Sequence, residues 1–309
     1  MSAPPSTRLA LLAVLALATL PSAARAQAPE RGPVVVDLAF GARGLGMGGA
    51  FQTDAGDPDA VFVNPALAAQ AGGFSLGAQR FDTESTAFSI STARAWYGGG
   101  IFGGIRHLDA AGATAPGLHT GGIDPLLAGG GTGASETALT LGYGRELFGL
   151  RTGVSTSWLQ QRYGASNAAT FSFDLGVSTD LGPGTVHLAA RNLGSATTWG
   201  AREVELPSTV AAGWGAYGRQ LGPLDWGGAV TAARRADGEW TYGGGLEFGY
   251  WPVRGRTFMA RIGAQSVPDT DASPLTFGGS YLGDELVIDY AFQAVDGFDG
   301  VHRITLGWR

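Results

Sequence analysis

From Gly72 to the C-terminus, apolar residues alternate with polar or small residues at a period of two. The pattern is clearest in residues 171–181, 240–250, 286–293 and 302–308. A period of two places successive side chains on opposite faces of an extended strand, so each segment has one apolar face. The pattern therefore predicts an all-β fold.

The alternating segments are bounded by glycine, proline and aspartate, which favour turns. They give about fourteen strands of about ten residues or more, the length that a tilted strand needs to cross a bilayer. The predicted strands span residues 72–81, 85–94, 97–108, 135–146, 150–162, 168–181, 185–193, 207–219, 223–234, 239–251, 256–265, 274–282, 285–293 and 300–309. Strands of soluble sandwiches average about five or six residues. We therefore expect residues 72–309 to form a transmembrane antiparallel β-barrel rather than a soluble secreted β-protein.

The connections between the predicted strands alternate in length. Those after even-numbered strands, such as 95–96 and 283–284, are mostly short, and those after odd-numbered strands, such as 109–134 and 194–206, are mostly longer. Outer-membrane barrels alternate short periplasmic turns with longer extracellular loops in this way. With an even number of strands, both ends of the mature chain are expected at the periplasmic end of the barrel.

The longest connection, residues 109–134, is low in charge and contains three apolar residues, Ile123, Leu126 and Leu127. Exposed apolar residues in a loop can mark a binding surface. The same residues could instead pack inward if the loop folds back over the barrel mouth. The sequence leaves these two interpretations open.

The two faces of the predicted strands differ in charge. One face carries aromatic and aliphatic residues and suits lipid, whereas the other carries glycine, serine and charged residues. An arginine that faces lipid at mid-bilayer costs about 2–4 kcal/mol, whereas a charge in a wet lumen can be paired. The charged residues expected to face the lumen are Asp174, Arg191, Glu247, Arg261, Asp289 and Arg303.

The first 26 residues have the features of a secretory signal peptide. Arg8 provides the positive start, residues 9–20 form an apolar stretch, and residues 24–26 match a small-residue cleavage site. The apolar stretch, at about twelve residues, is too short to span a bilayer. We expect export and a mature chain that begins near Gln27.

Residues 27–71 lie between this signal and the first predicted strand and are predicted to form a plug inside the barrel. Glycines allow positive φ angles and close backbone approach, which a segment folded in a narrow lumen needs. Pro65 favours an extended Asn64, whose side chain can cap a turn, and we favour this structural role over direct ligand contact. The motif residues of the plug are Gly46, Met47, Gly48, Gly49, Phe51, Asn64, Pro65 and Ala66.

The sequence contains few features that are typical of metal binding, nucleic-acid binding or catalysis. The chain has no cysteine and a formal net charge of -6 without a basic stripe, which argues against thiolate metal sites and nucleic-acid partners. Asp54, Asp57 and Asp59 do not match a calcium-loop spacing and are interpreted as a solvated turn. The four histidines are dispersed, and no G-x-S-x-G pattern occurs. We therefore expect no enzymatic activity, no metal and no cofactor.

The glycine-rich segment closely resembles the start of the PorV/PorQ family of outer-membrane proteins and more distantly that of the FadL-type transporters. The matching residues are Gly46-Met47-Gly48-Gly49-Ala50-Phe51 and Asn64-Pro65-Ala66. Residues 191–194, followed by Leu206-Pro207, resemble a pairing in the middle of PorV-like barrels, and residues 302–309 look like their last strand.

The resemblance implies a location in the outer membrane of a Gram-negative cell, with membrane lipid as one partner. A PorV/PorQ-like protein would bind partner or cargo proteins of type IX-like secretion. The alternative is a FadL-like passive transporter of hydrophobic small molecules, in which the plug rearranges to release the ligand.

Overall fold

The computed structural model describes residues 32–38, 41–50, 58–81, 85–110, 133–199, 202–222, 224–253, 255–267, 272–296 and 299–308. The barrel strands within these ranges are β1 (Gly73–Arg80), β2 (Thr86–Trp96), β3 (Gly99–Ala110), β4 (Ala134–Leu147), β5 (Leu150–Tyr163), β6 (Ser166–Leu181), β7 (Gly184–Gly194), β10 (Thr209–Leu221), β11 (Leu224–Arg235), β12 (Trp240–Val253), β13 (Arg256–Gln265), β14 (Ala272–Leu282), β15 (Leu286–Val295) and β16 (Val301–Trp308). The predicted signal peptide, Phe51 and most of the connection 109–134 lie outside the described residues.

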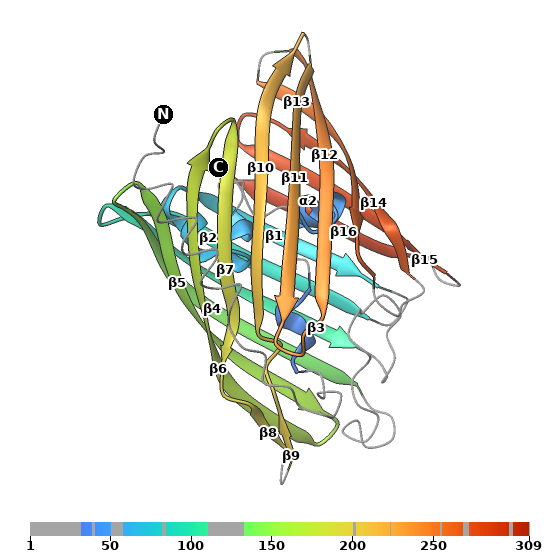
Figure 1. Cartoon of the computed structure of the whole chain (residues 1–309). Helices are drawn as coiled ribbons and strands as arrows, with labels where there is room; N and C mark the ends of the chain where they lie inside the picture. The colour runs from blue at the N-terminus through green and yellow to red at the C-terminus, as the bar shows by residue number, and fades with distance from the viewer. Residues whose placement is uncertain are drawn as a thin grey trace.

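These fourteen strands close into an antiparallel barrel (Figure 1), with β1 paired to β16 and β7 paired to β10. The predicted all-β barrel is confirmed. We call the end with short connections, such as 97–98 and 148–149, the turn end, and the opposite end the loop end. No helix among the described residues is long and apolar enough to span a membrane.

The alternation of the sequence separates the two faces of the wall. In β12, Leu246 and Phe248 are each 45% exposed on the outside, whereas Glu247 between them is 2% exposed. Buried serines, threonines and charged residues of the other strands lie on the same inner face as Glu247. The apolar outer surface suits contact with lipid, and the barrel satisfies its backbone hydrogen bonds internally.

Residues 194–206 contain a hairpin that the sequence analysis treats as a plain connection. Its strands are β8 (Thr197–Trp199) and β9 (Arg202–Val204). Trp199 stacks on Tyr163, with ring centroids 4.9 Å apart, and buries against the loop end of the barrel. Three-residue strands are too short to show a periodic signal, which is why the pattern missed them.

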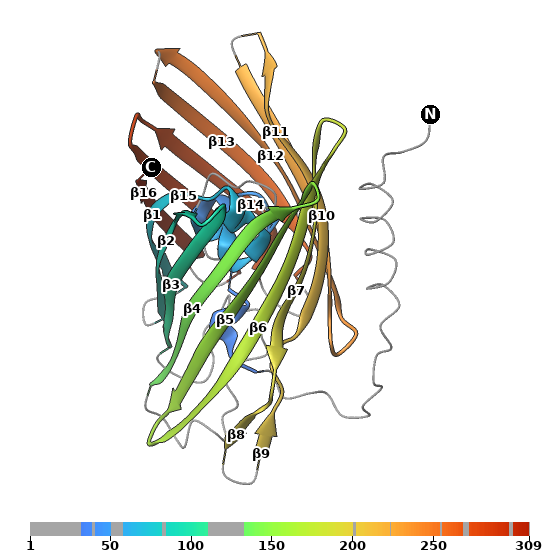
Figure 2. The same cartoon turned by 90° about the vertical axis from the view of Figure 1, so that its left-hand side faces the viewer.

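Within the described part of the N-terminal segment, four short helices lie inside the barrel: η1 (Val34–Val36), α2 (Ala42–Gly46), η2 (Pro58–Phe62) and η3 (Pro65–Ala69). Figure 2 shows them within the ring of strands. Most of their residues are buried. We call the described residues from 32 to 71 the plug.

The plug starts at the loop end. The amide of Val35 donates to Glu136 Oε2 at 2.7 Å, and Arg235 forms an ion pair with Asp37 at 2.7 Å. Glu136 and Arg235 lie at the loop ends of β4 and β11. The sequence placed both ends of the mature chain at the turn end, but the first described residues lie at the other end. The cause is that the three buried valines of η1 pack with the apolar side chains there.

Candidate functional site

Asn64 begins helix η3 as its N-cap. Its side-chain oxygen accepts a hydrogen bond from the Ala66 amide at 3.0 Å, and Pro65 occupies the first helical turn. Proline suits this position because its fixed φ matches the helix and its missing N–H is not needed. Asn64 is fully buried, so the motif has the geometry of a capped turn inside the barrel.

Replacing Asn64 with alanine should loosen η3. The loss of an N-cap costs about 0.5–2 kcal/mol. Serine keeps an acceptor for the cap, and Asn64 Nδ2 has no hydrogen-bond partner among the described residues, so Asn64→Ser should be milder. Protease cleavage within the plug of the purified, folded barrel measures the effect. Equal cleavage rates for the two variants would contradict a capping role.

The wall carries a glycine patch where η3 rests against β3, β4, β5 and β6. At Gly153 an added Cβ would overlap the carbonyl group of Pro65. Three further glycines lie against the same helix or its cap: Gly100, Gly144 and Gly176. Small residues here let the plug backbone approach the strands closely.

A second glycine patch holds the Gly-Met-Gly-Gly segment against β12, β13 and β14. Met47 is fully buried, and a Cβ added at Gly245 would lie 2.7 Å from the Met47 Cα. Gly48 has φ +61, and a Cβ there would lie 2.5 Å from the Ala264 carbonyl oxygen. Backbone conformation and lack of space both require glycine at position 48.

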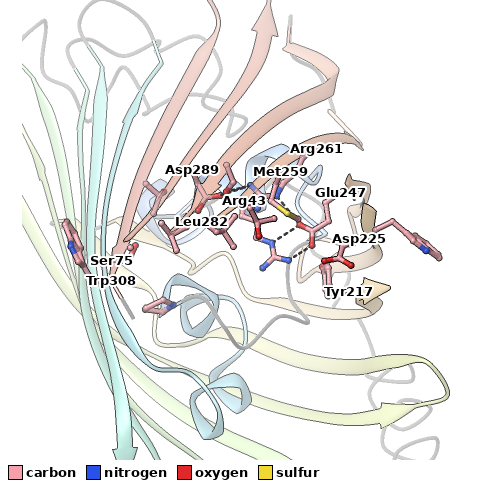
Figure 3. A pocket seen from close by; sticks show the side chains of 18 residues that line it. Arg43, Ser75, Tyr217, Asp225, Glu247, Met259, Arg261, Leu282, Asp289 and Trp308 are labelled. Atoms are coloured by element: carbon pink, nitrogen blue, oxygen red, sulfur yellow. Dashed lines mark hydrogen bonds and ion pairs between the residues drawn. The ribbon is translucent and has the colours of Figure 1, made fainter. Parts of the chain in front are cut away.

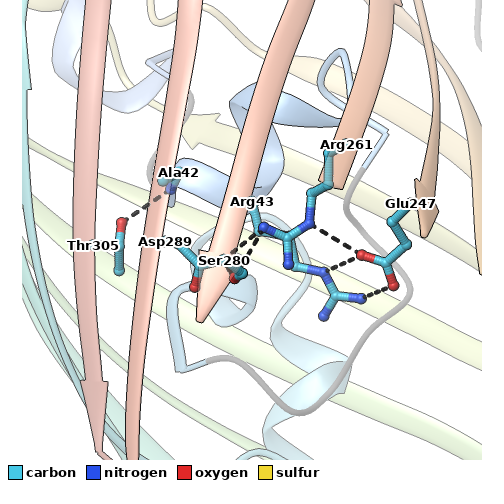
Figure 4. Close-up of polar contacts among 7 residues, drawn as sticks. All are labelled: Ala42, Arg43, Glu247, Arg261, Ser280, Asp289 and Thr305. Carbon is cyan, nitrogen blue, oxygen red and sulfur yellow. Dashed lines mark hydrogen bonds and ion pairs between the residues drawn. The ribbon is translucent and has the colours of Figure 1, made fainter. Parts of the chain in front are cut away.

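An ion network joins α2 to the wall (Figure 4). Arg43 binds Glu247 through two contacts, of 2.7 and 3.1 Å, and Arg261 binds the same carboxylate at 3.1 Å. Arg261 also binds Asp289 at 2.6 Å, and Ser280 donates to Asp289. The four charged residues, Arg43, Glu247, Arg261 and Asp289, are named here the ion network.

The charge of Arg43 is stabilised where it lies. Burial is the largest single influence and would lower the pKa of its guanidinium, but the attraction of Glu247, Tyr217 and Asp289 and the hydrogen bond to Glu247 together outweigh it, and the pKa lies above its ordinary value. The guanidinium also lies over the Tyr217 ring, 4.8 Å from its centroid. The Ala42 amide donates to Thr305 Oγ1 at 3.0 Å, which fixes the start of α2.

The other charged residues expected in the lumen lie elsewhere on the inner face. Arg303 donates to Gln79 and Ser89, and Asp174 accepts from Ser155 and from the Asn192 amide. Arg191 is half-buried, and its Nε has no hydrogen-bond partner among the described residues.

The sequence analysis missed Arg43, although it is the only charged residue between residues 41 and 50. A single charged residue within a glycine-rich motif is the sequence feature that could have identified Arg43 as a site residue. The solvated turn expected at Asp59 is wrong, because Asp59 is fully buried and accepts hydrogen bonds from Ser75 and Ser91. Asp54 and Asp57 lie outside the described residues. Among the described residues, no group of three or more histidine or acidic side chains could hold a metal ion.

Asn192 belongs to residues 191–194, the segment that resembles the middle of PorV-like barrels, and it lies at a bulge in β7. It has φ +55, a conformation that asparagine tolerates better than most residues. Its amide donates to Asp174 at 2.7 Å, and its side chain donates to the Pro207 carbonyl at 3.2 Å. The side chain also reaches Asp37 of the plug at 3.5 Å. The motif therefore links a wall irregularity to the plug.

Asn192→Ala should destabilise the barrel by about 0.5–1.5 kcal/mol, because it removes one of the two side-chain hydrogen bonds to the buried Pro207 carbonyl, the other coming from Thr209. Strain at the positive φ adds of order 1 kcal/mol. Asn192→Gly loses the same hydrogen bonds without the strain, so its loss should be smaller. Urea unfolding in lipid vesicles measures both variants. A glycine variant less stable than the alanine variant would contradict the role of backbone conformation.

A cavity of about 270 Å³ opens at the turn end, next to α2 (Figure 3). Arg43, Glu247, Arg261 and Asp289 line it on the side of the plug, and Tyr217 and Asp225 lie beside them. The rest of the lining is mainly apolar or small: Pro58, Gly218, Trp226, Met259, Leu282, Val287, Gly307 and Trp308, with Ser75, Ser280, Thr257 and Thr305. We call this cavity the turn-end pocket. Apolar walls with a few convergent polar groups are typical of small-molecule sites.

No protein-family model matches the sequence, and no curated protein matches it. Solved structures do match the fold. The toluene transporter TodX of Pseudomonas putida has a TM-score of 0.54 at 12% identity, over 87% of this chain and 96% of TodX. The toluene transporter TbuX of Ralstonia pickettii has a TM-score of 0.54 at 13% identity, over 87% of this chain and 98% of TbuX.

A FadL homologue of Pseudomonas aeruginosa gives a TM-score of 0.53 at 12% identity, over 91% of this chain and 99% of that protein. At sequence identities of 12–13%, these matches show that the fold is similar, but they do not show which ligand this chain binds. The plugged fourteen-strand barrel of this chain has the fold that TodX, TbuX and the FadL homologue share.

Proposed function

We propose that this protein is an outer-membrane channel for hydrophobic small molecules. The observation that carries the proposal is a closed barrel whose lumen is filled by its own N-terminal plug, next to a pocket with largely apolar walls. A lumen of this width would pass water and polar solutes unless it were filled. The plug therefore suits selective passage rather than a general pore.

The comparison with solved structures also supports a channel for hydrophobic small molecules. TodX and TbuX are toluene transporters, and CymD, which matches with a TM-score of 0.53, is a monoaromatic hydrocarbon channel. The apolar outer wall supports an outer-membrane location, and the signal peptide expected in residues 1–26 would provide export.

Toluene uptake tests the proposed function. A Gram-negative host without its own hydrocarbon channels should accumulate labelled toluene faster when it produces this protein than with an empty vector. Uptake of a small hydrophilic solute controls for leakage and should not change. Absence of faster toluene uptake would contradict the proposal if a heat-dependent gel shift shows that the barrel is folded.

The PorV/PorQ resemblance has no support from the comparisons. Its main motifs have structural explanations in this fold, since Asn64 caps η3 and Asn192 forms a bulge. Binding of secretion or cargo proteins is therefore not the function that we propose.

A further inference from the structure

The turn-end pocket contains more negative than positive charge. Its lining includes two arginines, Arg43 and Arg261, and three carboxylates, Glu247, Asp289 and Asp225. Both arginines are already bound by Glu247, and Arg261 is bound by Asp289 as well. Among the described residues, neither a hydrogen bond nor an ion pair is made by the side-chain carboxylate of half-buried Asp225. The pocket thus has one carboxylate in excess.

This arrangement is unfavourable for an anionic ligand. A buried carboxylate needs a partner that compensates for the water it loses. Here a ligand anion would compete with Glu247 and Asp289 for the two arginines, and it would share the pocket with Asp225. Like charges at short distance repel strongly when little water separates them.

The shape of the pocket favours a compact ligand. Its volume of about 270 Å³ lies just below the range of about 300 to 1,000 Å³ that is typical of ligand sites. Met259, Leu282 and Val287 supply apolar surface on three neighbouring strands. Methionine adapts its shape easily, so a planar ring can be accommodated beside it.

We propose that the turn-end pocket is a binding site for compact hydrophobic molecules without negative charge, and that it rejects carboxylates. The proposal rests on the proposed function and narrows it, because it excludes fatty-acid anions as ligands of this pocket. The ion network then has two roles: it fastens α2 to the wall, and it neutralises the two arginines that would otherwise attract anions.

Three probes of similar shape and different charge test this selectivity. Ligand-observed NMR on the purified full chain in detergent measures the binding of toluene, the benzylammonium ion and benzoate. We expect toluene and benzylammonium to bind at least about tenfold more tightly than benzoate. Benzoate binding equal to or tighter than that of toluene would overturn the proposal.

Two substitutions locate the probes in the pocket. Asp225→Asn should reduce the preference for benzylammonium over benzoate, whereas Asp109→Asn, at an exposed position near the loop end of β3, should leave it unchanged. Met259→Trp should fill the pocket and weaken toluene binding about tenfold or more, whereas Met259→Leu keeps the space. An unchanged charge preference in Asp225→Asn would overturn the proposal even if Met259→Trp failed to fold.

The uptake experiment and the binding experiment can contradict the proposed function and the proposed binding site independently of each other. Without toluene uptake by the wild-type protein, the proposed function fails, although the selectivity of the purified pocket is still measured. If uptake occurs but toluene binds equally well to folded Met259→Trp, the channel function stands and the turn-end pocket is not the ligand site.

Discussion

Glu247→Gln should release α2 from the barrel wall and make the closed channel leak. Glu247 holds both Arg43 and Arg261, with only 3% of its side chain exposed. Removing one partner of a buried ion pair costs about 3–5 kcal/mol, because the remaining charge is left without compensation. Single-channel current in planar bilayers should show frequent openings that the wild-type protein lacks, and the plug should be cleaved faster by protease.

The exposed Glu285 in the connection between β14 and β15 provides a matched control. Glu285→Gln removes the same charge from the chain and should leave current and cleavage unchanged. In a double-mutant cycle, Arg43→Met combined with Glu247→Gln should cost less than the sum of the single changes, since residues in direct contact couple. Additive effects, or a silent Glu247→Gln, would contradict the fastening role of the ion network.

Gly245→Val should displace the Gly-Met-Gly-Gly segment from the wall. Its Cβ would lie 2.7 Å from both the Met47 Cα and the Met47 carbonyl oxygen, and these backbone atoms cannot rotate away. Overpacking of this kind typically costs 1–3 kcal/mol, and a forced backbone shift can cost more. The temperature of the gel shift should fall, and residues 41–50 should become accessible to protease.

Gly244 is the adjacent residue of the same strand, and it offers a comparison within β12. A Cβ there would have its nearest neighbours at 3.6 Å, in ordinary contact with Ala229 and Val230 on the outer face. Gly244→Val changes the composition and β-propensity of the strand equally, so only contact with the plug separates the two variants. Equal effects of the two substitutions would show that the plug does not rest on this glycine patch.

The barrel could be predicted from the sequence because its signal is local. Alternation within each strand shows which face is apolar, and the length of each segment matches the thickness of a bilayer, without knowledge of any partner. The connections followed from turn residues for the same reason. The β8–β9 hairpin was not predicted because Trp199 in it packs on Tyr163 of another segment, and a contact between distant segments leaves no periodic pattern in the sequence.

The candidate site depended on contacts between distant residues. Arg43 and Glu247 are 204 residues apart, and the sequence around either residue does not indicate that the two form a pair. Likewise, the buried role of Asp59 comes from Ser75 and Ser91 on the wall and not from its own turn. Such pairs arise only when the plug lies inside the barrel.

The sequence by itself therefore determined the wall: an all-β chain of about fourteen strands, with an apolar outside and a polar inside, because the period of two is set by the geometry of each strand alone. Only the tertiary structure decided how the N-terminal segment lies in the lumen, which glycines receive it and which charges pair across it. Those choices depend on the space and the charge that all strands together leave at the centre, and no single segment contains that information.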